Sequence, residues 1–375
     1  MKLFWRADAG EEEIIPVAKP RLPTFEQIVP YLKRIDTARW YSNGGPLIRE
    51  FEEQLAAYAG GGEARVATVA NATLGLTLAL LACDLPAGSL CMVPSWTFAA
   101  TGHAILLAGL IPWIVDVSGE TWALETDIAF ELLRKAPGKV SAVIPVSPFG
   151  APLAMEPWLR FREKTGIAVV VDAAAAFDGL RASAIPVVVS LHATKVCGIG
   201  EGGFVLSTDG KFTEEVQKRS NFGFWNSRES TARSFNAKLS EYAAAVGLAS
   251  LTVWPEIRLD FLRVGKAYRS YLEGEESVRL QSGFGENWIS STVNVALPEN
   301  SANRLTDLLA KKKIGSRRWW GGGLHQHRSF LEFPRDRVEQ TESLAERVIG
   351  LPCWRDLPNE QIAQVCAVLS SAQEK

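Results

Sequence analysis

The chain has 375 residues, of which 47% are hydrophobic and 22% are charged. Its length gives room for roughly two or three domains, and its composition lacks the low hydrophobicity and high net charge of disordered proteins. The 40 basic and 42 acidic residues leave a net charge of −2. This balance argues against a protein that binds nucleic acid through a positive surface.

The five cysteines lie far apart and form no CxxC motif, a pattern more typical of reduced thiols than of a disulfide framework. The histidine cluster at residues 325–327 has no carboxylate at ligand spacing, so we expect no metal site. Residues 1–13 contain no apolar signal segment, and the most apolar stretch, residues 99–115, is short and includes a histidine and a proline. The sequence therefore predicts a cytoplasmic protein that is not bound to a membrane.

From residue 46 onwards, helical and strand patterns alternate. A helix is predicted from Pro46, because Leu47, Phe51 and Leu55 lie on one face and proline suits the first helical turn. It ends at the glycines of residues 60–62. Short apolar runs predict strands at residues 65–70, 90–93, 111–117, 140–146, 167–172, 185–191 and 204–207.

Near-continuous apolar strands separated by helices, such as those at residues 73–83 and 101–108, predict a mostly parallel sheet covered on both faces. The last two strands have no helix between them, so we expect one of them to be antiparallel. Further elements are expected as a strand at 291–297 and helices at 236–254, 258–272, 302–313 and from 359. We therefore predict a large α/β domain at 38–255 and a smaller α+β domain at 256–375, with 1–37 packed near the smaller one.

Polar residues follow several strands, at the edge of a parallel sheet where ligands bind. Asn71, Ala72 and Thr73 lie between a strand and a helix, where unpaired backbone N–H groups favour a phosphate. Simple capping of the helix explains the same residues equally well. Phe98 follows the next strand and could either stack on a flat ring or pack in the core.

Asp172 ends an apolar strand, and a carboxylate there either has a cationic or hydrogen-bonding partner or caps the next segment. Lys195 follows the next strand, before a glycine-rich loop. If it is buried, its pKa is lowered and Schiff-base chemistry is favoured; otherwise it is a surface lysine. Ser190 could add a hydroxyl to the phosphate site, and His192 could contact a substrate or fill the core. Together these residues match the needs of a pyridoxal 5′-phosphate (PLP) site.

The chain resembles the DegT/StrS family of PLP-dependent sugar aminotransferases over about residues 35–370. The motifs that carry the resemblance are, in order, SNGGP (42–46), NATLGLTLAL (71–80), PSWTFAAT (94–101), VDAAAAF (171–177), SLHATK (190–195), GEGGFV (200–205), FNAKLSEYAAAVGL (235–248) and ERVIGLPCW (346–354). The resemblance implies the PLP-dependent transferase fold of type I, which is like that of aspartate aminotransferase. It would have a mostly parallel, seven-stranded sheet in the large domain.

The resemblance also implies roles for single residues. Lys195 would hold PLP as a Schiff base and move the substrate proton, while Asp172 would keep the pyridine nitrogen protonated. Phe98 would stack on the ring. Asn236 would reach the phosphate of the neighbouring subunit's cofactor, so two complete sites would require a homodimer. The residues expected to bind the phosphate within the subunit are Ala72, Thr73 and Ser190.

The sequence departs from the family's usual pattern in three places. Ala175 replaces a common glutamine that contacts the cofactor, and Lys238 replaces a common arginine. Trp319 and Trp320 stand where the family often has His or Tyr near the sugar nucleotide. Trp320 and His325 are therefore candidates for substrate contacts, as is the histidine of SLHATK, with an interface or core role equally open.

The sequence thus predicts a cytoplasmic, homodimeric aminotransferase that moves an amino group from an amino acid, such as glutamate, to a nucleotide-linked ketosugar in polysaccharide or glycoside biosynthesis. A PLP-dependent sugar dehydratase or lyase is one alternative, which Ala175 leaves open. Relatives that dehydrate carry histidine in place of Lys195, which argues against it. A non-catalytic regulatory relative is the other alternative. The sugar, the nucleotide and the ring carbon cannot be predicted from the sequence.

Overall fold

The computed structural model describes residues 14–299 and 301–371. Its central sheet consists of two halves with the strand orders β1-β8-β7-β6 and β3-β2-β4-β5. The halves are continuous because β5 (Ala168–Val169) and β6 (Val171–Asp172) lie on either side of the single residue Val170. Backbone pairing carries on across this junction, where Asp172 N donates to Pro145 O at 3.0 Å. With β5 and β6 taken together the sheet has seven strands, as predicted.

All strands of this sheet except β8 run in one direction. The remaining strands are β1 (Arg65–Val69), β2 (Leu90–Pro94), β3 (Ile111–Val115), β4 (Val140–Val143), β7 (Val187–Ser190) and β8 (Gly203–Ser207). β8 is antiparallel to both β1 and β7, whereas the other pairs are parallel. The prediction that one of the last two strands is antiparallel is confirmed. The parallel strands therefore end at one edge of the sheet, and β8 begins there.

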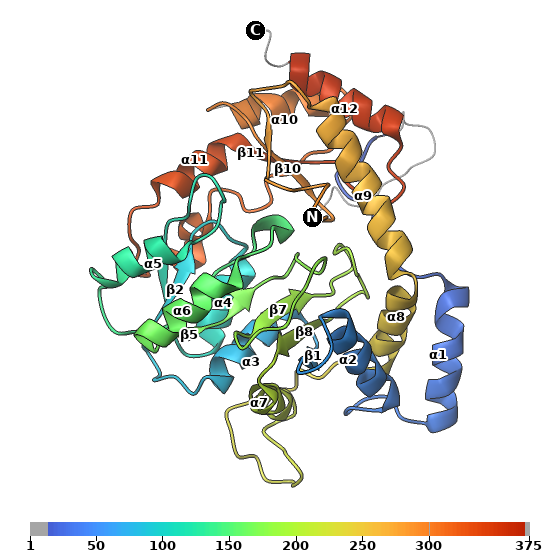
Figure 1. Ribbon diagram of the computed structural model, residues 1–375, viewed down its shortest axis with the longest axis vertical. Helices are drawn as coiled ribbons and strands as arrows, with labels where there is room; N and C mark the ends of the chain where they lie inside the picture. The colour runs from blue at the N-terminus through green and yellow to red at the C-terminus, as the bar shows by residue number, and fades with distance from the viewer. Residues whose placement is uncertain (1–13, 300, 372–375) are drawn as a thin grey trace.

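Helices cover both faces of the sheet (Figure 1). One face is covered by α3 (Ala72–Ala82), α4 (Ala99–Leu107) and α7 (Gly210–Ser220). The other is covered by α2 (Pro46–Tyr58), α5 (Thr126–Leu133), α6 (Met155–Thr165) and α8 (Glu241–Thr252). Successive strand side chains point to opposite faces: Met92 of β2 joins the core that contains Phe51 of α2, and Val93 joins the core that contains Leu76 of α3.

The C-terminal third forms a second group of elements, at the top of Figure 1, which α9 connects to α8. Its elements are α9 (Trp254–Tyr271), β9 (Arg279–Leu280), β10 (Val293–Ala296), α10 (Ser301–Lys311), α11 (Glu339–Arg347), β11 (Val348–Leu351) and α12 (Asn359–Ser371). The three strands form an antiparallel sheet in the order β11-β10-β9. This group has the α+β texture that the sequence predicts.

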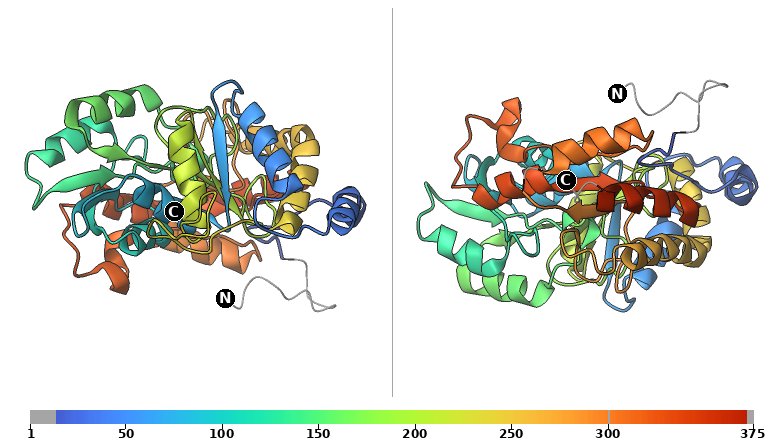
Figure 2. Two further views of the ribbon diagram at one scale, coloured as in Figure 1. Left: turned by 90° about the horizontal axis from the view of Figure 1, so that it is seen from below. Right: turned by 90° about the horizontal axis from the view of Figure 1, so that it is seen from above.

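The N-terminal part of the chain contacts both groups. Cys353 N donates to Val17 O at 3.1 Å, which ties the start of the described chain to the C-terminal group. The helix α1 (Phe25–Ala38) instead packs on α8, where Tyr31 Oη and Thr252 Oγ1 are 3.2 Å apart. Figure 2 shows α1 at the side of the molecule, beside α8. Residues 1–13, on which the prediction of no signal segment rests, lie outside the described residues.

One stretch of the C-terminal third returns to the large sheet. Ile114 N of β3 donates to Pro334 O at 2.9 Å, and Asp336 N donates to Ile114 O at 3.0 Å. The ring of Phe330 packs 4.9 Å from that of His103 on α4. A domain boundary near residue 255 stays a prediction, and the stretch 324–336 lies against the larger part.

The helix predicted at residues 236–254 is wrong at its start, because α8 begins only at Glu241. Ser240 caps this helix, with its Oγ accepting Ala243 N at 3.1 Å. The residues before it are extended, since Ala237 O accepts Ala70 N at 2.7 Å. The helices α5 and α6 lie between predicted strands, as expected, but no bounds were predicted for them, and α1, α7, α11, β9 and β11 were not predicted. Among the described residues, no helix combines the length and the apolar character needed to cross a membrane.

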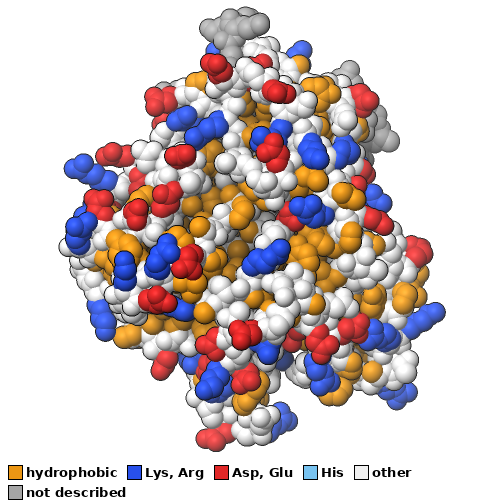
Figure 3. All heavy atoms as spheres, viewed as in Figure 1, with side chains coloured by type: hydrophobic (Ala, Val, Ile, Leu, Met, Phe, Trp, Pro, Cys, Tyr) orange, Lys and Arg blue, Asp and Glu red, His pale blue; other side chains and the backbone are white. Residues whose placement is uncertain are grey.

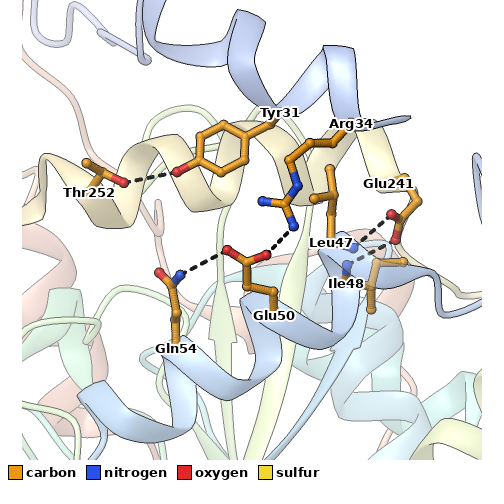
Figure 4. A network of polar contacts seen from close by, with 8 residues as sticks. All are labelled: Tyr31, Arg34, Leu47, Ile48, Glu50, Gln54, Glu241 and Thr252. Carbon is orange, nitrogen blue, oxygen red and sulfur yellow. Dashed lines mark hydrogen bonds and ion pairs between the residues drawn. The ribbon is translucent and has the colours of Figure 1, made fainter. Parts of the chain in front are cut away.

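The buried carboxylate of Glu241 fixes the position of α2 (Figure 4). It accepts hydrogen bonds from Leu47 N at 2.9 Å and Ile48 N at 3.0 Å, which are unpaired donors of the first helical turn. Gly45 permits this approach, since a Cβ there would lie 2.6 Å from Glu241 Cδ. The SNGGP motif therefore closes α2 onto the start of α8.

We expect Glu241→Ala to lower the free energy of unfolding by about 2–3 kcal/mol, because two buried N–H groups lose a charged acceptor. Urea denaturation followed by circular dichroism measures this. Glu256→Ala is the matched control, since Glu256 is exposed in the first turn of α9 and its loss should change stability little. Equal stability of the two variants would contradict the role given to Glu241.

Candidate active site

Asp172 and Lys195 lie at the carboxyl ends of adjacent parallel strands. Asp172 ends β6 and is buried, and Lys195 lies in the turn after β7, where Lys195 N donates to His192 O at 2.8 Å. Burial raises the pKa of Asp172 and lowers the pKa of Lys195, and the attraction between the two charges opposes both changes. The two side chains therefore share one buried site.

Among the described residues, hydrogen bonds are assigned to the side chain of Asp172 but not to that of Lys195. Asp172 Oδ2 accepts from Thr101 Oγ1 at 2.7 Å, and Asp172 Oδ1 accepts from Ala174 N at 3.0 Å. Thr97 Oγ1 lies 2.8 Å from Thr101 Oγ1 and extends the chain of hydroxyls. Within the described residues no acceptor is assigned to Lys195 Nζ. Because donors stabilise only the carboxylate, Lys195 is the member of the pair that more readily loses its charge.

Phe98 lies on the surface, at the start of the helix whose Thr101 contacts Asp172, rather than in the core. It directly precedes α4, and its carbonyl accepts Thr101 N at 3.1 Å. Its side chain is 60% exposed. The alternative that Phe98 packs in the core is therefore wrong, and a ring bound above Asp172 could stack on it.

The start of α3 forms a cradle for an anion. Asn71 Oδ1 caps Leu74 N at 2.9 Å, but no acceptor is assigned to the N–H groups of Ala72 and Thr73 within the described residues. Gly203, the first residue of β8, lies against this turn: a Cβ there would be 2.8 Å from Ala72 N. Two free donors at a helix N-terminus beside a position with no side chain fit a phosphate.

Ser190 lies at the same cradle. It is the register partner of Gly203 in the β7–β8 ladder and is buried. Its Oγ accepts His192 N at 3.2 Å, so its hydroxyl hydrogen can donate to an anion. The structure thus places Ser190 with Ala72 and Thr73 around one position, as the predicted phosphate site requires.

His192 is partly exposed, so it does not fill the core. Its Nδ1 lies 2.8 Å from Thr194 Oγ1 and its Nε2 lies 3.6 Å from Glu201 Oε1. Both partners belong to the loop that carries Lys195. These contacts orient the ring beside the lysine and leave a substrate role as a prediction.

Asn236 is exposed, two residues before Lys238. Its Oδ1 accepts from Lys238 Nζ at 2.8 Å, and that ammonium lies 4.7 Å from the ring centroid of Phe222. Partial burial lowers the pKa of Lys238. Asn236 therefore faces outward from the subunit, next to an exposed aromatic side chain.

His325 lies inside the protein, behind the end of β2. Its Nδ1 is 2.7 Å from Ser95 Oγ, and its Nε2 is 3.5 Å from Glu342 Oε1. Burial is the main cause that lowers the pKa of His325, so the ring is neutral near pH 7. A structural role between β2 and α11 accounts for these contacts.

Trp320 reaches the same edge of the sheet from the C-terminal third. Its ring stacks on Phe149 with centroids 3.9 Å apart and meets Trp96 edge-on at 5.4 Å. Phe149 follows β4 and has a φ of 56°, a strained value for a residue with a side chain. In the view of the molecule that Figure 3 draws, hydrophobic side chains gather around the middle of the face.

Sequence reasoning missed three contributors: Thr101 as a partner of Asp172, Gly203 beside the phosphate cradle, and Phe149 as the support of Trp320. For Thr101 a signal was present, because a threonine in the first turn of the helix that follows a strand lies at the edge where the parallel strands end. Gly203 and Phe149 meet their partners only through the sheet order, which the sequence does not show.

The aminotransferase model of the DegT/DnrJ/EryC1/StrS family matches residues 24–370. The chain belongs to this family. It is 28% identical over 374 residues to dTDP-4-amino-4,6-dideoxy-D-glucose transaminase of Escherichia coli, with 96% of this chain and 98% of that protein covered. The resemblance predicted from the motifs is confirmed.

Solved structures agree with this assignment. A Bacillus cereus protein assigned to the PLP-dependent aminotransferases matches with a TM-score of 0.90 and 30% identity, covering 96% of this chain and 100% of that one. DesI, solved in the presence of its TDP-sugar product, matches with a TM-score of 0.85 and 31% identity, covering 96% and 93%. The predicted fold of type I is confirmed, and PLP is the cofactor of this enzyme class.

We expect Thr101→Val to lower kcat/KM for transamination about tenfold, because the Asp172 carboxylate loses a hydrogen bond that stabilises its charged form. The pKa of Asp172 would rise further, so the acid limb of the pH profile should move to higher pH. Steady-state assays between pH 5 and 9 measure this. Thr77→Val is the control: Thr77 Oγ1 bonds Thr73 O inside α3. An unshifted acid limb in Thr101→Val would rule out the proposed positioning of Asp172.

Proposed function

We propose that this protein transfers an amino group from an amino acid, such as glutamate, to a nucleotide-linked ketosugar. The observation that carries the proposal is the buried Asp172–Lys195 pair beside the anion cradle at the start of α3. The names of the relatives support a sugar nucleotide as the acceptor.

PLP, when bound, supplies an aldehyde that joins to amines and a ring that withdraws electrons from the neighbouring carbon. Lys195 would hold the cofactor and act as the base. Burial lowers the pKa of Lys195, which favours its neutral form, so Nζ would take a proton from the substrate carbon and return it to the cofactor carbon that had carried the aldehyde oxygen. The same amine serves both half-reactions.

Asp172 would hold the proton on the nitrogen of the cofactor ring. Thr101 Oγ1 and Ala174 N donate to its carboxylate and favour the charged form, which would stabilise a cationic ring nitrogen in a buried place. Phe98 would cover the ring. The N–H groups at the start of α3 and the Ser190 hydroxyl would anchor the phosphate.

The aromatic group of Trp96, Phe149 and Trp320 would form one wall of the acceptor site. Aromatic faces pack well against the apolar face of a sugar or against a base. In this arrangement His325 supports the wall from behind through Ser95, and Trp320 contacts the substrate.

The same proposal includes a homodimer with shared sites. Several aromatic side chains are exposed, among them Tyr41, Phe222, Trp225 and Tyr242, and clustered exposed aromatics are typical of interfaces. Asn236, which faces outward beside Phe222, would bind the phosphate of the partner subunit's cofactor. The five cysteines are all free, which supports a reducing, cytoplasmic location. The proposed role in polysaccharide or glycoside biosynthesis would be carried out there.

We expect the wild-type protein mixed with PLP to show an absorbance band in the near-violet range that borohydride removes. Lys195→Ala should not form this band, and Asp172→Asn should form it but lose activity by at least about hundredfold. Formation of 2-oxoglutarate from glutamate in the presence of a ketosugar nucleotide tests the transfer itself. A wild-type protein that stays colourless with PLP would overturn the proposal.

Mixing two defective subunits tests the shared site. Lys195→Ala removes the base of its own subunit, and Asn236→Ala removes the contact to the partner's cofactor. A mixed dimer then contains one site with both wild-type residues and one site that lacks both. Each mixed dimer should therefore have about half the activity of a wild-type dimer. Unfolding and refolding of the mixed variants, followed by the transamination assay, measures recovery. No recovery would show that Asn236 serves its own subunit.

A further inference from the structure

A small, positively lined recess lies next to Lys195. Its walls include Lys19 and Arg21 from the N-terminal segment, Thr194 and Lys195 from the loop after β7, and Arg355 from the segment after β11. The three segments are far apart in the sequence and meet at this recess. The recess is small, with a volume of about 20 Å³, so only a small group can enter it.

The N-terminal segment is held in place by backbone contacts. Cys353 N donates to Val17 O at 3.1 Å, and Gly315 N donates to Ile15 O at 2.7 Å. Gly315 allows this approach, since a Cβ there would lie 2.7 Å from Val17 N. The chain leading to Lys19 therefore runs beside the segment that carries Arg355.

The cations of the recess differ in how they are paired. Arg355 Nε and Nη2 both lie 2.9 Å from Asp260 Oδ2, so this guanidinium is fixed and its charge is offset. Lys19 and Arg21 are exposed, and no ion pair is assigned to either of them within residues 14–299 and 301–371. The recess therefore has positive charge in excess, next to Lys195, whose pKa is lowered by burial.

The position of the recess decides which anion it suits. In an α-amino acid, the carboxylate is bonded to the carbon that bears the reacting amine, so it must lie close to Lys195 when that amine reacts. In a nucleotide-linked sugar, the diphosphate is separated from the keto carbon by bonds of the sugar ring and is larger than this recess. Size and distance both favour the carboxylate.

We infer that Lys19 and Arg21, with Arg355 behind them, form the subsite for the α-carboxylate of the amino-acid donor and of its keto-acid product. This inference rests on the proposed aminotransferase function and assigns the donor half of that site. The donor would place its carboxylate in the recess and its amine toward Lys195. Acceptor sugars, which have no such carboxylate, would leave the recess empty.

Spectroscopy of the first half-reaction tests the inference. The PLP-loaded protein is mixed with L-glutamate, and the loss of the near-violet band is followed. It is also mixed with propylamine, which has an amine but no carboxylate and can only exchange with Lys195, and the small shift of the band on exchange is followed. Lys19→Met and Arg21→Gln should each raise the half-saturating glutamate concentration about tenfold, the effect of losing one charge-assisted contact. The reaction with propylamine should not change. Lys33→Met, an exposed lysine on α1, is the matched control and should behave as wild type.

A binding measurement gives a readout independent of turnover. Succinate should raise the melting temperature of the wild-type protein and of Lys33→Met, but raise it less in Arg21→Gln. If the variants instead lose stabilisation by dTDP and keep that by succinate, the cations bind the nucleotide diphosphate and the inference is wrong. If wild type reacts with glutamate and both variants match it, the inference fails while the proposed function stands. If wild type forms no band with PLP, the proposed function itself fails.

Discussion

Burial of two opposite charges at one edge of the sheet is the constraint on which the rest of the site depends. Removing Asp172 and Lys195 from water disfavours the charged form of each, and only their mutual attraction and nearby donors restore it. Thr101 and Ala174 N both stabilise the carboxylate. The balance therefore keeps an anion in place while the lysine can give up its proton, a combination that a base beside a protonated ring requires.

The position of Asp172, and with it this charge balance, depends on a rigid connection between the large sheet and the C-terminal elements. Asp178, six residues after Asp172, is buried and accepts from Arg258 Nε of α9 at 2.7 Å and from Ile289 N at 3.2 Å. Ser290 Oγ donates to Phe149 O at 2.7 Å. Because Asp178 is buried and its carboxylate depends on these donors, a shift of the loop after Asp172 would break contacts to α9 and to the segment before β10.

The sequence predicted the strands of the large sheet, their mostly parallel direction and the residues that end them. These are local patterns of apolar runs and the polar residues that follow them. It did not predict that Thr101 would meet Asp172, since that contact depends on β2 lying next to β4 and β4 next to β5. It placed the start of α8 too early, because Phe235–Ser240 continues an apolar, helix-compatible pattern. Tertiary pairing of Ala237 with Ala70 overrides that pattern, and Ser240 then caps the helix.

The antiparallel direction of β8 explains how the anion cradle can exist. A parallel strand between β1 and β7 would end at this edge and would have to lead into a crossover helix over the same space. β8 begins there instead, and its first residue, Gly203, pairs with Val69 of β1 on one side and with Ser190 of β7 on the other. A side chain at Gly203 would lie 2.8 Å from Ala72 N and 2.9 Å from Val189 O, so any other residue would crowd the start of α3. The reversed strand and its glycine together leave the N–H groups of α3 and the Ser190 hydroxyl facing one open position, at the edge where Lys195 and Asp172 meet.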